Sequence, residues 1–379
     1  MAYESIRGET AWRTVRGARH LRWSNNHESF NAQVYPVAHT PKFKLSPDDR
    51  IFCIGSCFAR NIEEHLTYRG IKVLSQGLVI PRREFGGRPG GILNKFTTFS
   101  MLQELEWMFN PPAIDASLFS QDVNDQWLDL QLSSGAKPVT LERAMERRSY
   151  LLEEYFTRVK QADVVIMTLG LIETWRDLQT GVYLNVPPPA GNVLRNGDRY
   201  VLEITDYNQN VAALAAIRTR LLELNPDLRI IATVSPIPLG ISFSGLDPVI
   251  ANSLSKSVLR ASVQTILDHP NVDYFPSFEM VTAGAREEAF ADDCRHAKDS
   301  TVAKVIDFFL NTYTAGLENP EPEFSELGYL AANPDVDRAV RSGEWDNGFQ
   351  HYMAQGKAEG RPLRPADGPS RLMRKSGMS

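Results

Sequence analysis

Two short segments of the chain carry side chains that could act together as nucleophile and base. The first is Gly55-Ser56-Cys57-Phe58-Ala59, which places a serine directly after a glycine. The second is Asp293-Cys294-Arg295-His296, in which a carboxylate stands three residues before a histidine. A serine hydroxyl becomes an effective nucleophile when an imidazole takes its proton and a carboxylate fixes the tautomer of that imidazole. Ser56, His296 and Asp293 are therefore a candidate catalytic set for acyl transfer.

Ser56 lies between a predicted strand and a predicted helix. Residues 51–54 are apolar and predict a buried strand, and residues 60–66 predict a helix that Gly70 closes. Gly55 leaves room for a sharp turn, which would hold the Ser56 hydroxyl at a sheet edge beside the N–H groups of a helix N-terminus. Such N–H groups stabilise an anion or an oxyanion. The same position also suits an ordinary N-cap serine, and the turn alone does not separate the two interpretations.

The order of the two segments is more informative than either one. The Asp-x-x-His spacing lets a single polar loop supply both base and orienter, but it also occurs by chance in many loops. An early serine and a late Asp-x-x-His, on a chain of alternating strands and helices, together favour a serine hydrolase.

Strands alternate with helices along most of the chain. Besides 51–54, strands are predicted at 71–74, 164–167, 229–234 and 272–275, and helices at 101–109, 141–160, 210–224, 253–267 and 302–309. The continuous apolar character of 164–167 is typical of a parallel strand covered on both faces. This pattern predicts an α/β fold with three α/β/α layers and a mainly parallel sheet. Its site would lie beyond the carboxyl ends of the strands, where Ser56, Gly170, Ser235 and Pro276 should meet.

The segment around Ser56 resembles the naming motif of the GSCFA family, a branch of the SGNH (GDSL-like) esterase and acyltransferase superfamily. The resemblance covers roughly residues 40–315, with further matching segments at Asn94 and at 168–175, 233–238 and 275–279. It implies an SGNH-like fold in which Ser56 is the nucleophile, His296 the base and Asp293 its orienter. It also implies an oxyanion hole formed by backbone N–H groups near Ser56 and Gly170 with the Asn94 amide. The expected substrate, by the same resemblance, is an acylated carbohydrate.

Two positions depart from the pattern of related proteins. The third block of the superfamily usually reads Gly-x-Asn-Asp, whereas this chain has Gly170-Leu171-Ile172-Glu173 and lacks that asparagine. Ala297 follows His296 where related proteins often have proline, which alters loop rigidity more than chemistry. The first departure keeps a second hypothesis open, namely a catalytically inactive carbohydrate-binding or assembly protein on the same fold.

Four further residues are candidates for substrate binding: Glu173, Trp175, Arg82 and Arg83. They could shape a carbohydrate pocket or hold an anionic group, but core packing for the tryptophan and a solvated loop for the arginines explain them as well. Glu173 and Glu279 could also be the paired acids of a glycosidase. Nothing in the spacing fixes the separation of these two carboxyl groups, so a structural role is the favoured interpretation.

The three cysteines, Cys53, Cys57 and Cys294, cannot form a closed set of disulfides and suggest a reducing compartment. Their spacing does not match a zinc site, so we expect no metal and no cofactor. A Cys57 thiol at a helix N-terminus, paired with His296, is an alternative nucleophile. Packing against the first helix is the more ordinary role for this small side chain.

The composition is that of a soluble globular protein. The chain has 379 residues, of which 42% are hydrophobic and 23% charged, and its net charge of −5 predicts no nucleic-acid partner. Residues 1–7 lack the apolar core of a signal peptide, and no run approaches membrane-spanning length. We therefore expect a cytoplasmic protein without a membrane span that acts on a small-molecule or oligosaccharide ester.

The chain divides into five predicted parts. Residues 1–40 form an N-terminal arm, 41–315 the α/β domain, 316–324 an acidic linker with two prolines, 325–362 a small helical module, and 363–379 a polar tail. The arm interleaves arginine with tryptophan, which can grip phosphates or sugars, although packing is the favoured explanation. The module resembles a helical appendage of various bacterial proteins. It is too small for a large core of its own, so we expect it to dock on the main domain or on a protein partner.

Overall fold

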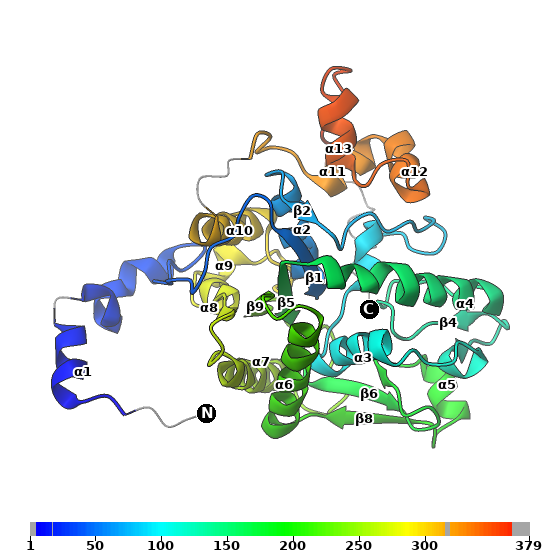
Figure 1. Cartoon of the computed structure of the whole chain (residues 1–379), viewed down its shortest axis with the longest axis horizontal. Coiled ribbons are helices and arrows are strands. Elements are labelled where there is room, and N and C mark those ends of the chain that lie inside the picture. The colour runs from blue at the N-terminus through cyan, green and yellow to red at the C-terminus, as the bar shows by residue number, and fades with distance from the viewer. Residues whose placement is uncertain (1–4, 17, 315–318, 366–379) are drawn as a thin grey trace.

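The computed structural model describes residues 5–16, 18–314 and 319–365 (Figure 1). Its centre is a five-stranded sheet in the order β10-β9-β5-β1-β2, in which every neighbouring pair is parallel. The strands are β1 (Arg50–Gly55), β2 (Lys72–Val73), β5 (Val164–Leu169), β9 (Arg229–Val234) and β10 (Val272–Tyr274). Gly55 pairs with Thr168, and Leu169 pairs with Val234. The carboxyl ends of β1, β5 and β9 therefore finish level with one another.

Helices cover both faces of this sheet. One face carries α3 (Thr98–Phe109), α6 (Tyr207–Leu224) and α7 (Pro248–Val263), and the other carries α2 (Cys57–Thr67), α8 (Ser277–Thr282) and α10 (Asp299–Tyr313). Alternate residues of β5 enter the two separate apolar cores, with Val165 and Met167 on the first face and Val164 and Ile166 on the second. This period of two explains why the strand is apolar throughout. The predicted three-layer α/β fold with a parallel sheet is confirmed.

Several elements differ from the prediction. The helix expected over 141–160 is α4 (Leu141–Tyr150), followed by a π-helical turn (Leu151–Tyr155) and a 3₁₀ helix (Phe156–Gln161). Two small antiparallel sheets were not predicted: β7-β6-β8, with β6 (Glu173–Asp177), β7 (Tyr183–Leu184) and β8 (Tyr200–Ile204), and the pair β3 (Ser120–Gln121) and β4 (Trp127–Leu128). These strands are short and mix polar with apolar residues, so they lack the apolar run that marks a buried strand. Three further helices are α1 (Gly8–Val15), α5 (Ala190–Arg195) and α9 (Arg286–Ala289).

The two ends of the chain are organised differently. Helix α1 projects from the body at the left of Figure 1 and buries none of its residues. The C-terminal module, with α11 (Glu326–Ala332), α12 (Pro334–Ser342) and α13 (Gly348–His351), contacts the main domain. Its aromatic core includes Tyr68, which follows α2, and the Tyr68 hydroxyl accepts a hydrogen bond from the N–H of Glu326. Residues 316–318 of the predicted linker and 366–379 of the predicted tail lie outside the described residues.

No helix in the described ranges is both long and apolar enough to cross a bilayer.

Candidate active site

The turn between β1 and α2 depends on a close approach of Gly55 to β5. Gly55 has a φ of +144°, and a Cβ atom at this position would lie 2.2 Å from Thr168 Oγ1 and 2.5 Å from the Thr168 carbonyl oxygen. Only glycine fits such a space and such a backbone conformation. Gly55 therefore allows β1 to end tightly against β5 and the chain to turn into α2 at Ser56.

Ser56 caps α2 and lies among hydroxyl groups from two neighbouring strand ends. It is 5% exposed, and its Oγ is 3.2 Å from both Thr168 Oγ1 and Ser235 Oγ. Its own N–H donates to Thr168 Oγ1 at 2.8 Å, and the N–H of Phe58 donates to Ser56 Oγ at 3.4 Å. The N–H of Cys57, as the first helical residue, has no acceptor within the helix. The N-cap position and the position expected of a nucleophile thus coincide.

Asp293 and His296 are hydrogen-bonded to each other in an exposed loop. His296 Nδ1 is 2.5 Å from Asp293 Oδ2, and Asp293 Oδ1 accepts from the N–H groups of Arg295 at 3.0 Å and His296 at 2.9 Å. Slight desolvation raises the pKa of Asp293, but these hydrogen bonds outweigh it and lower the pKa to about 2. The side chain of His296 is 44% exposed and that of Asp293 is 49% exposed. Between them, Cys294 has a φ of +55°, which costs energy in a residue other than glycine.

The loop of Asp293 and His296 is attached to the chain that follows β9 through Arg295. The Arg295 guanidinium donates to the Pro238 carbonyl at 3.5 Å, and a Cβ on Gly240 would lie only 2.6 Å from it. The same guanidinium acts electrostatically on the thiol of Cys57, the residue after Ser56. The loop therefore lies near the Ser56 turn. Ser56 and His296 are nevertheless not hydrogen-bonded to each other in the part of the chain that the structure describes.

The two other residues expected at an oxyanion hole lie on segments that meet the end of β1. Next to Asn94, the N–H of Lys95 donates to the Gly55 carbonyl at 2.8 Å, and the Asn94 Oδ1 atom is buried without a hydrogen-bond partner among the described residues. Gly170 follows β5 directly, and a Cβ there would lie 2.7 Å from the Phe96 carbonyl oxygen. Both residues are therefore held close to the Ser56 turn by backbone contacts.

Glu173 and Trp175, on β6, both hold the loop after β9. Glu173 accepts hydrogen bonds from Ser242 Oγ at 2.5 Å and from the N–H of Phe243 at 2.8 Å. The Trp175 ring packs edge-on against Phe243, with ring centroids 5.4 Å apart. The two candidates for substrate binding thus share one structural task, which is to fix the position of residues 242 and 243.

The second acid of the glycosidase hypothesis also has partners within the protein. Glu279 pairs with Arg260 at 2.9 Å and accepts a hydrogen bond from the Tyr274 hydroxyl at 2.8 Å. Glu173 and Glu279 each therefore have a structural role in these contacts.

The two arginine candidates lie at the boundary with the C-terminal module. Arg82 donates to Asp337 of α12 at 2.9 Å, and Arg83 is exposed. From the other side, Arg341 of α12 donates to the backbone carbonyls of Phe85 at 2.9 Å and Gly87 at 2.6 Å. Arg82 is thus engaged in attaching the module to the loop that carries it.

Cys57 is half-buried beside Ser56. Burial raises the pKa of its thiol, while the cations of Arg88, Arg295 and Lys256 oppose the shift. A thiol that stays protonated is a weak nucleophile, which disfavours the alternative mechanism on Cys57. The other two cysteines are buried (Cys53) and exposed (Cys294).

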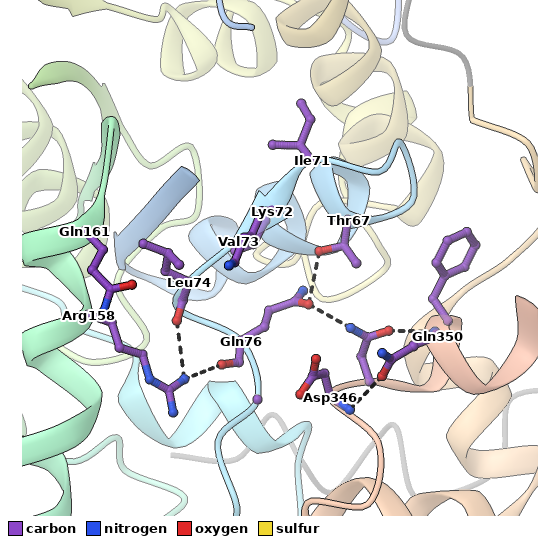
Figure 2. A pocket seen from close by; sticks show the side chains of 13 residues that line it. Thr67, Ile71, Lys72, Val73, Leu74, Gln76, Arg158, Gln161, Asp346 and Gln350 are labelled. Atoms are coloured by element: carbon purple, nitrogen blue, oxygen red, sulfur yellow. Dashed lines mark hydrogen bonds between the residues drawn. The ribbon is translucent and has the colours of Figure 1, made fainter. Parts of the chain in front are cut away.

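A cavity of about 640 Å³ lies away from the Ser56 turn, between the β2 segment and the C-terminal module (Figure 2). Gln76 stands at its centre, where its Oε1 accepts from Thr67 and Asn347 at 3.0 Å each. Arg158 closes another side by donating to the Gln76 carbonyl at 2.8 Å. Neither Ser56 nor His296 lines this cavity. Within the described ranges, no cluster of three or more His, Cys, Asp or Glu residues could hold a metal ion.

Three residues that contribute to the site were not part of the prediction: Thr168, Arg295 and Lys256. Ser235 was expected at the strand ends and does lie beside Ser56. Thr168 directly follows the predicted strand 164–167, so its place at a strand end was a usable signal. Nothing in the sequence indicated that Lys256 is buried at the site, because a lysine on a predicted helix is usually solvated.

Comparisons with known proteins give one family and several solved structures of low similarity. The GSCFA family model matches residues 50–309. No curated protein matches the chain. A Clostridium thermocellum family 3 carbohydrate esterase shares 11% identity over 70% of this chain and 95% of its own, with a TM-score of 0.28. An acetyl esterase mutant with acetate ion shares 11% identity over 68% of this chain and 93% of its own, with a TM-score of 0.25.

The third structure is an acetyl xylan esterase from the rumen bacterium Butyrivibrio proteoclasticus, which shares 12% identity over 73% of this chain and 65% of its own, with a TM-score of 0.27. At TM-scores this low, none of the three carries an argument about the reaction of this protein. The family match is different, because it spans more than half of the chain and includes the Ser56 turn. The chain belongs to the GSCFA family.

Proposed function

We propose that the protein is a serine-dependent ester hydrolase or O-acyltransferase of SGNH type that works through an acyl-enzyme on Ser56. One observation carries the proposal. The Ser56 hydroxyl lies at the N-terminus of α2 and at the level ends of three parallel strands, and a bonded Asp293–His296 pair is attached to the same edge through Arg295. A nucleophile, a base and an orienter are the three parts that acyl transfer requires.

In the first step, Ser56 Oγ attacks the carbonyl carbon of the ester, and its proton moves to His296 Nε2. Asp293 holds the Nδ1–H of the ring and stabilises the imidazolium that forms. The carbonyl oxygen becomes an oxyanion. When it collapses, the carbon–oxygen bond to the alcohol breaks, the alcohol takes the proton from His296, and the acyl group stays on Ser56. The Ser56 hydroxyl must turn from Thr168 and Ser235 toward His296 for this step.

The oxyanion requires donors that the protein does not already use. The N–H of Ser56 donates to Thr168, so the adjacent N–H of Cys57 is the better donor from this turn. The other proposed donors are the backbone N–H of Gly170 and the side-chain amide of Asn94. Together they would replace the asparagine amide that the third block of this chain lacks.

In the second step, a hydroxyl attacks the acyl-enzyme with His296 as base. Water gives hydrolysis and a free acid, whereas a sugar hydroxyl gives acyl transfer. We propose an acylated carbohydrate or polysaccharide precursor as the substrate, in the cytoplasm and without a metal or cofactor, with Glu173, Trp175, Arg82 and Arg83 shaping its surroundings. The carbohydrate class rests on family resemblance alone.

The test is the intact mass of the folded protein after treatment with a fluorophosphonate. We expect one adduct on the wild type and on Ser257→Ala, an exposed serine of α7, and none on Ser56→Ala or His296→Ala. A screen of acetylated oligosaccharides follows, in which Ser56→Ala should lose roughly a thousandfold or more in kcat. An adduct that persists in Ser56→Ala would contradict the assignment of the nucleophile. Full ester hydrolysis after Cys57 is alkylated with iodoacetamide would eliminate the thiol mechanism.

A second candidate is a carbohydrate-binding or assembly protein that does not turn over its ligand. It is favoured by the missing third-block asparagine and by the hydrogen bonds of Ser56 to Thr168 and Ser235 instead of His296. Calorimetry that shows saturable binding of an oligosaccharide, with neither an adduct nor ester turnover, would select this candidate.

A further inference from the structure

Lys256 is a buried cation without an anionic partner. It lies on α7 and is 1% exposed, and no carboxylate of the described residues forms an ion pair with it. Lys95, the other lysine buried to this degree in the described ranges, pairs with Glu104 at 2.5 Å. Burying an ammonium group without a carboxylate is costly, so its place in the fold calls for an explanation.

The ammonium group of Lys256 joins the two segments that hold Ser56. It donates to the Gly170 carbonyl at 2.8 Å and to the Ile237 carbonyl at 3.0 Å. Gly170 stands two residues after Thr168, and Ile237 stands two residues after Ser235. Thr168 and Ser235 are the two hydroxyl partners of Ser56.

The contact with Ile237 is tightened by a second hydrogen bond, because the N–H of Ile237 donates to Ser235 Oγ at 3.3 Å. A shift of the Lys256 side chain would therefore move both partners of the Ser56 hydroxyl. The three strand ends that carry Ser56, Thr168 and Ser235 are level, so a single ammonium group can reach the chain beyond two of them.

The charge of Lys256 also reaches the Ser56 turn. It acts on the thiol of Cys57, the first residue of α2, and desolvation by burial lowers the pKa of Lys256 to about 7. In desolvated surroundings a positive charge acts on a neighbouring anion more strongly than it does in water. The charge lies at the carbonyl of Gly170, the first residue of the segment 170–173 that lacks the usual asparagine.

We propose that Lys256 is a positioning residue for the ester chemistry at Ser56, which it serves by fixing the segments after β5 and β9 and, when it is protonated, by directing positive charge toward the oxyanion. The inference rests on the proposed function and extends it, because it names a side chain that holds Gly170, one of the proposed oxyanion donors. Lys256 acts through Gly170 and Ile237 and does not touch the reacting atoms.

The experiment compares the wild type with Lys256→Met, which keeps the length of the side chain and removes its charge and its donors. Lys256→Arg restores both, and Arg260→Met removes a cation from the same helix as a matched control. Each protein is checked for cooperative unfolding and then assayed for fluorophosphonate labelling and for kcat and KM on p-nitrophenyl acetate.

We expect Lys256→Met to fold and to lose on the order of 100-fold in kcat, with KM within about twofold of the wild type, as for loss of one oxyanion-stabilising group. Lys256→Arg should recover at least about a tenth of the wild-type kcat, and Arg260→Met should match the wild type. If Lys256→Met unfolds, Lys256→Gln, which keeps an N–H donor without the charge, takes its place with the same expectation.

A folded Lys256→Met or Lys256→Gln with kcat within threefold of the wild type would overturn the inference. So would equal loss of kcat in Lys256→Met and Arg260→Met, because the effect would then not be specific to Lys256. An unlabelled and inactive wild type has a different meaning: the proposed function fails, and the role of Lys256 in ester chemistry fails with it.

Discussion

The Ser56 turn and the Asp293–His296 loop are fixed in place by different means. Ser56 is buried, and its hydroxyl is held by Thr168 and Ser235, which lie more than 100 residues away in the sequence. Asp293 and His296 are about half exposed, and their mutual contacts span three residues. Ser56 is thus positioned by the register of the sheet, whereas Asp293 and His296 are positioned by a local turn. Substitutions in the two regions should therefore separate stability from activity.

The largest effect is expected at Gly55, where both properties depend on one residue. Gly55→Ala would place a Cβ atom 2.2 Å from Thr168 Oγ1, at a φ of +144°. We expect a loss of at least about 3 kcal/mol of unfolding free energy and no labelling of Ser56. Gly70→Ala is the control, because it also has a positive φ but no heavy atom lies within 4 Å of the added carbon. It should cost about 1 kcal/mol. Equal losses in urea denaturation would disprove the role of the contact with Thr168.

The second effect separates activity from stability on the side of the loop. Asp293→Asn should lower kcat about 1,000-fold, because the imidazole loses the group that sets its tautomer. The unfolding free energy should change by less than about 1 kcal/mol, since the carboxylate is half exposed. Asp292→Asn, one residue earlier and also exposed, should leave kcat unchanged. A large loss of stability in Asp293→Asn would contradict the contrast between the two regions.

The pKa of Asp293 adds a condition on pH. Because this pKa is lowered to about 2, below its ordinary value near 3.9, the stabilising effect is complete above about pH 4 and is lost as the pH falls toward 2. Asp293 therefore stays ionised wherever the enzyme would work. If activity falls as the pH is lowered from 7 to 5, the group responsible is not Asp293. The same fall should be seen in the control variant Asp292→Asn.

The third effect is a loss of stability in the region of the sheet that holds Ser56. Thr168→Val keeps the shape of the side chain but removes the acceptor of the buried Ser56 N–H, which should cost about 1–3 kcal/mol. Thr282→Val removes an exposed hydroxyl on α8 that donates to a backbone carbonyl, and should change the stability by less than about 0.5 kcal/mol. Thermal or urea denaturation of the two variants checks the prediction, and a smaller cost at Thr168 than at Thr282 would refute it.

The last effect is a dependence of stability on pH, which is small at any one pH step. The folded pKa of Lys256 is about 7, well below the ordinary lysine value near 10.4, so between these values the unfolded chain binds a proton that the folded protein does not. Stability should therefore rise with pH in this range. Relative to Lys256→Met, the wild type should gain up to about 1.4 kcal/mol per pH unit between pH 7 and 9. A difference between the two proteins that stays constant from pH 6 to 9 would show that Lys256 keeps its charge in the fold.

The sequence sufficed for the parts of the fold in which a single physical requirement dominates. Residues 164–167 are covered on both faces and so carry no polar side chain, which made β5 and the parallel sheet predictable. Gly55 before Ser56 predicted the turn from strand to helix. The contact between Asp293 and His296 followed from their spacing, because three residues can bring both side chains to the same side of a turn.

The rest depends on contacts between distant segments, which no local pattern encodes. Strand β6 carries Glu173, Arg176 and Asp177, so its sequence resembles a loop, and its pairing with β8 is a property of the folded chain. The ion pair of Arg82 with Asp337 joins residues 255 positions apart. Lys256 could not be found either, since only the fold reveals that the carbonyls of Gly170 and Ile237 meet at its ammonium group.

The position of the C-terminal module has a consequence for how the protein behaves at high concentration. Strand β2 is the last of the central sheet, and it pairs with β1 on one side only. A free sheet edge is a template on which a strand from another molecule can pair. Here Gln350 of α13 stands across the cavity from this edge (Figure 2), and Asn347, the N-cap of α13, donates to Gln76 Oε1 at 3.0 Å. A chain shortened before residue 319 would leave this edge of the sheet uncovered and the Tyr68 ring without Phe324 and Phe349. We therefore expect the shortened chain to self-associate, even where its Ser56 turn is intact.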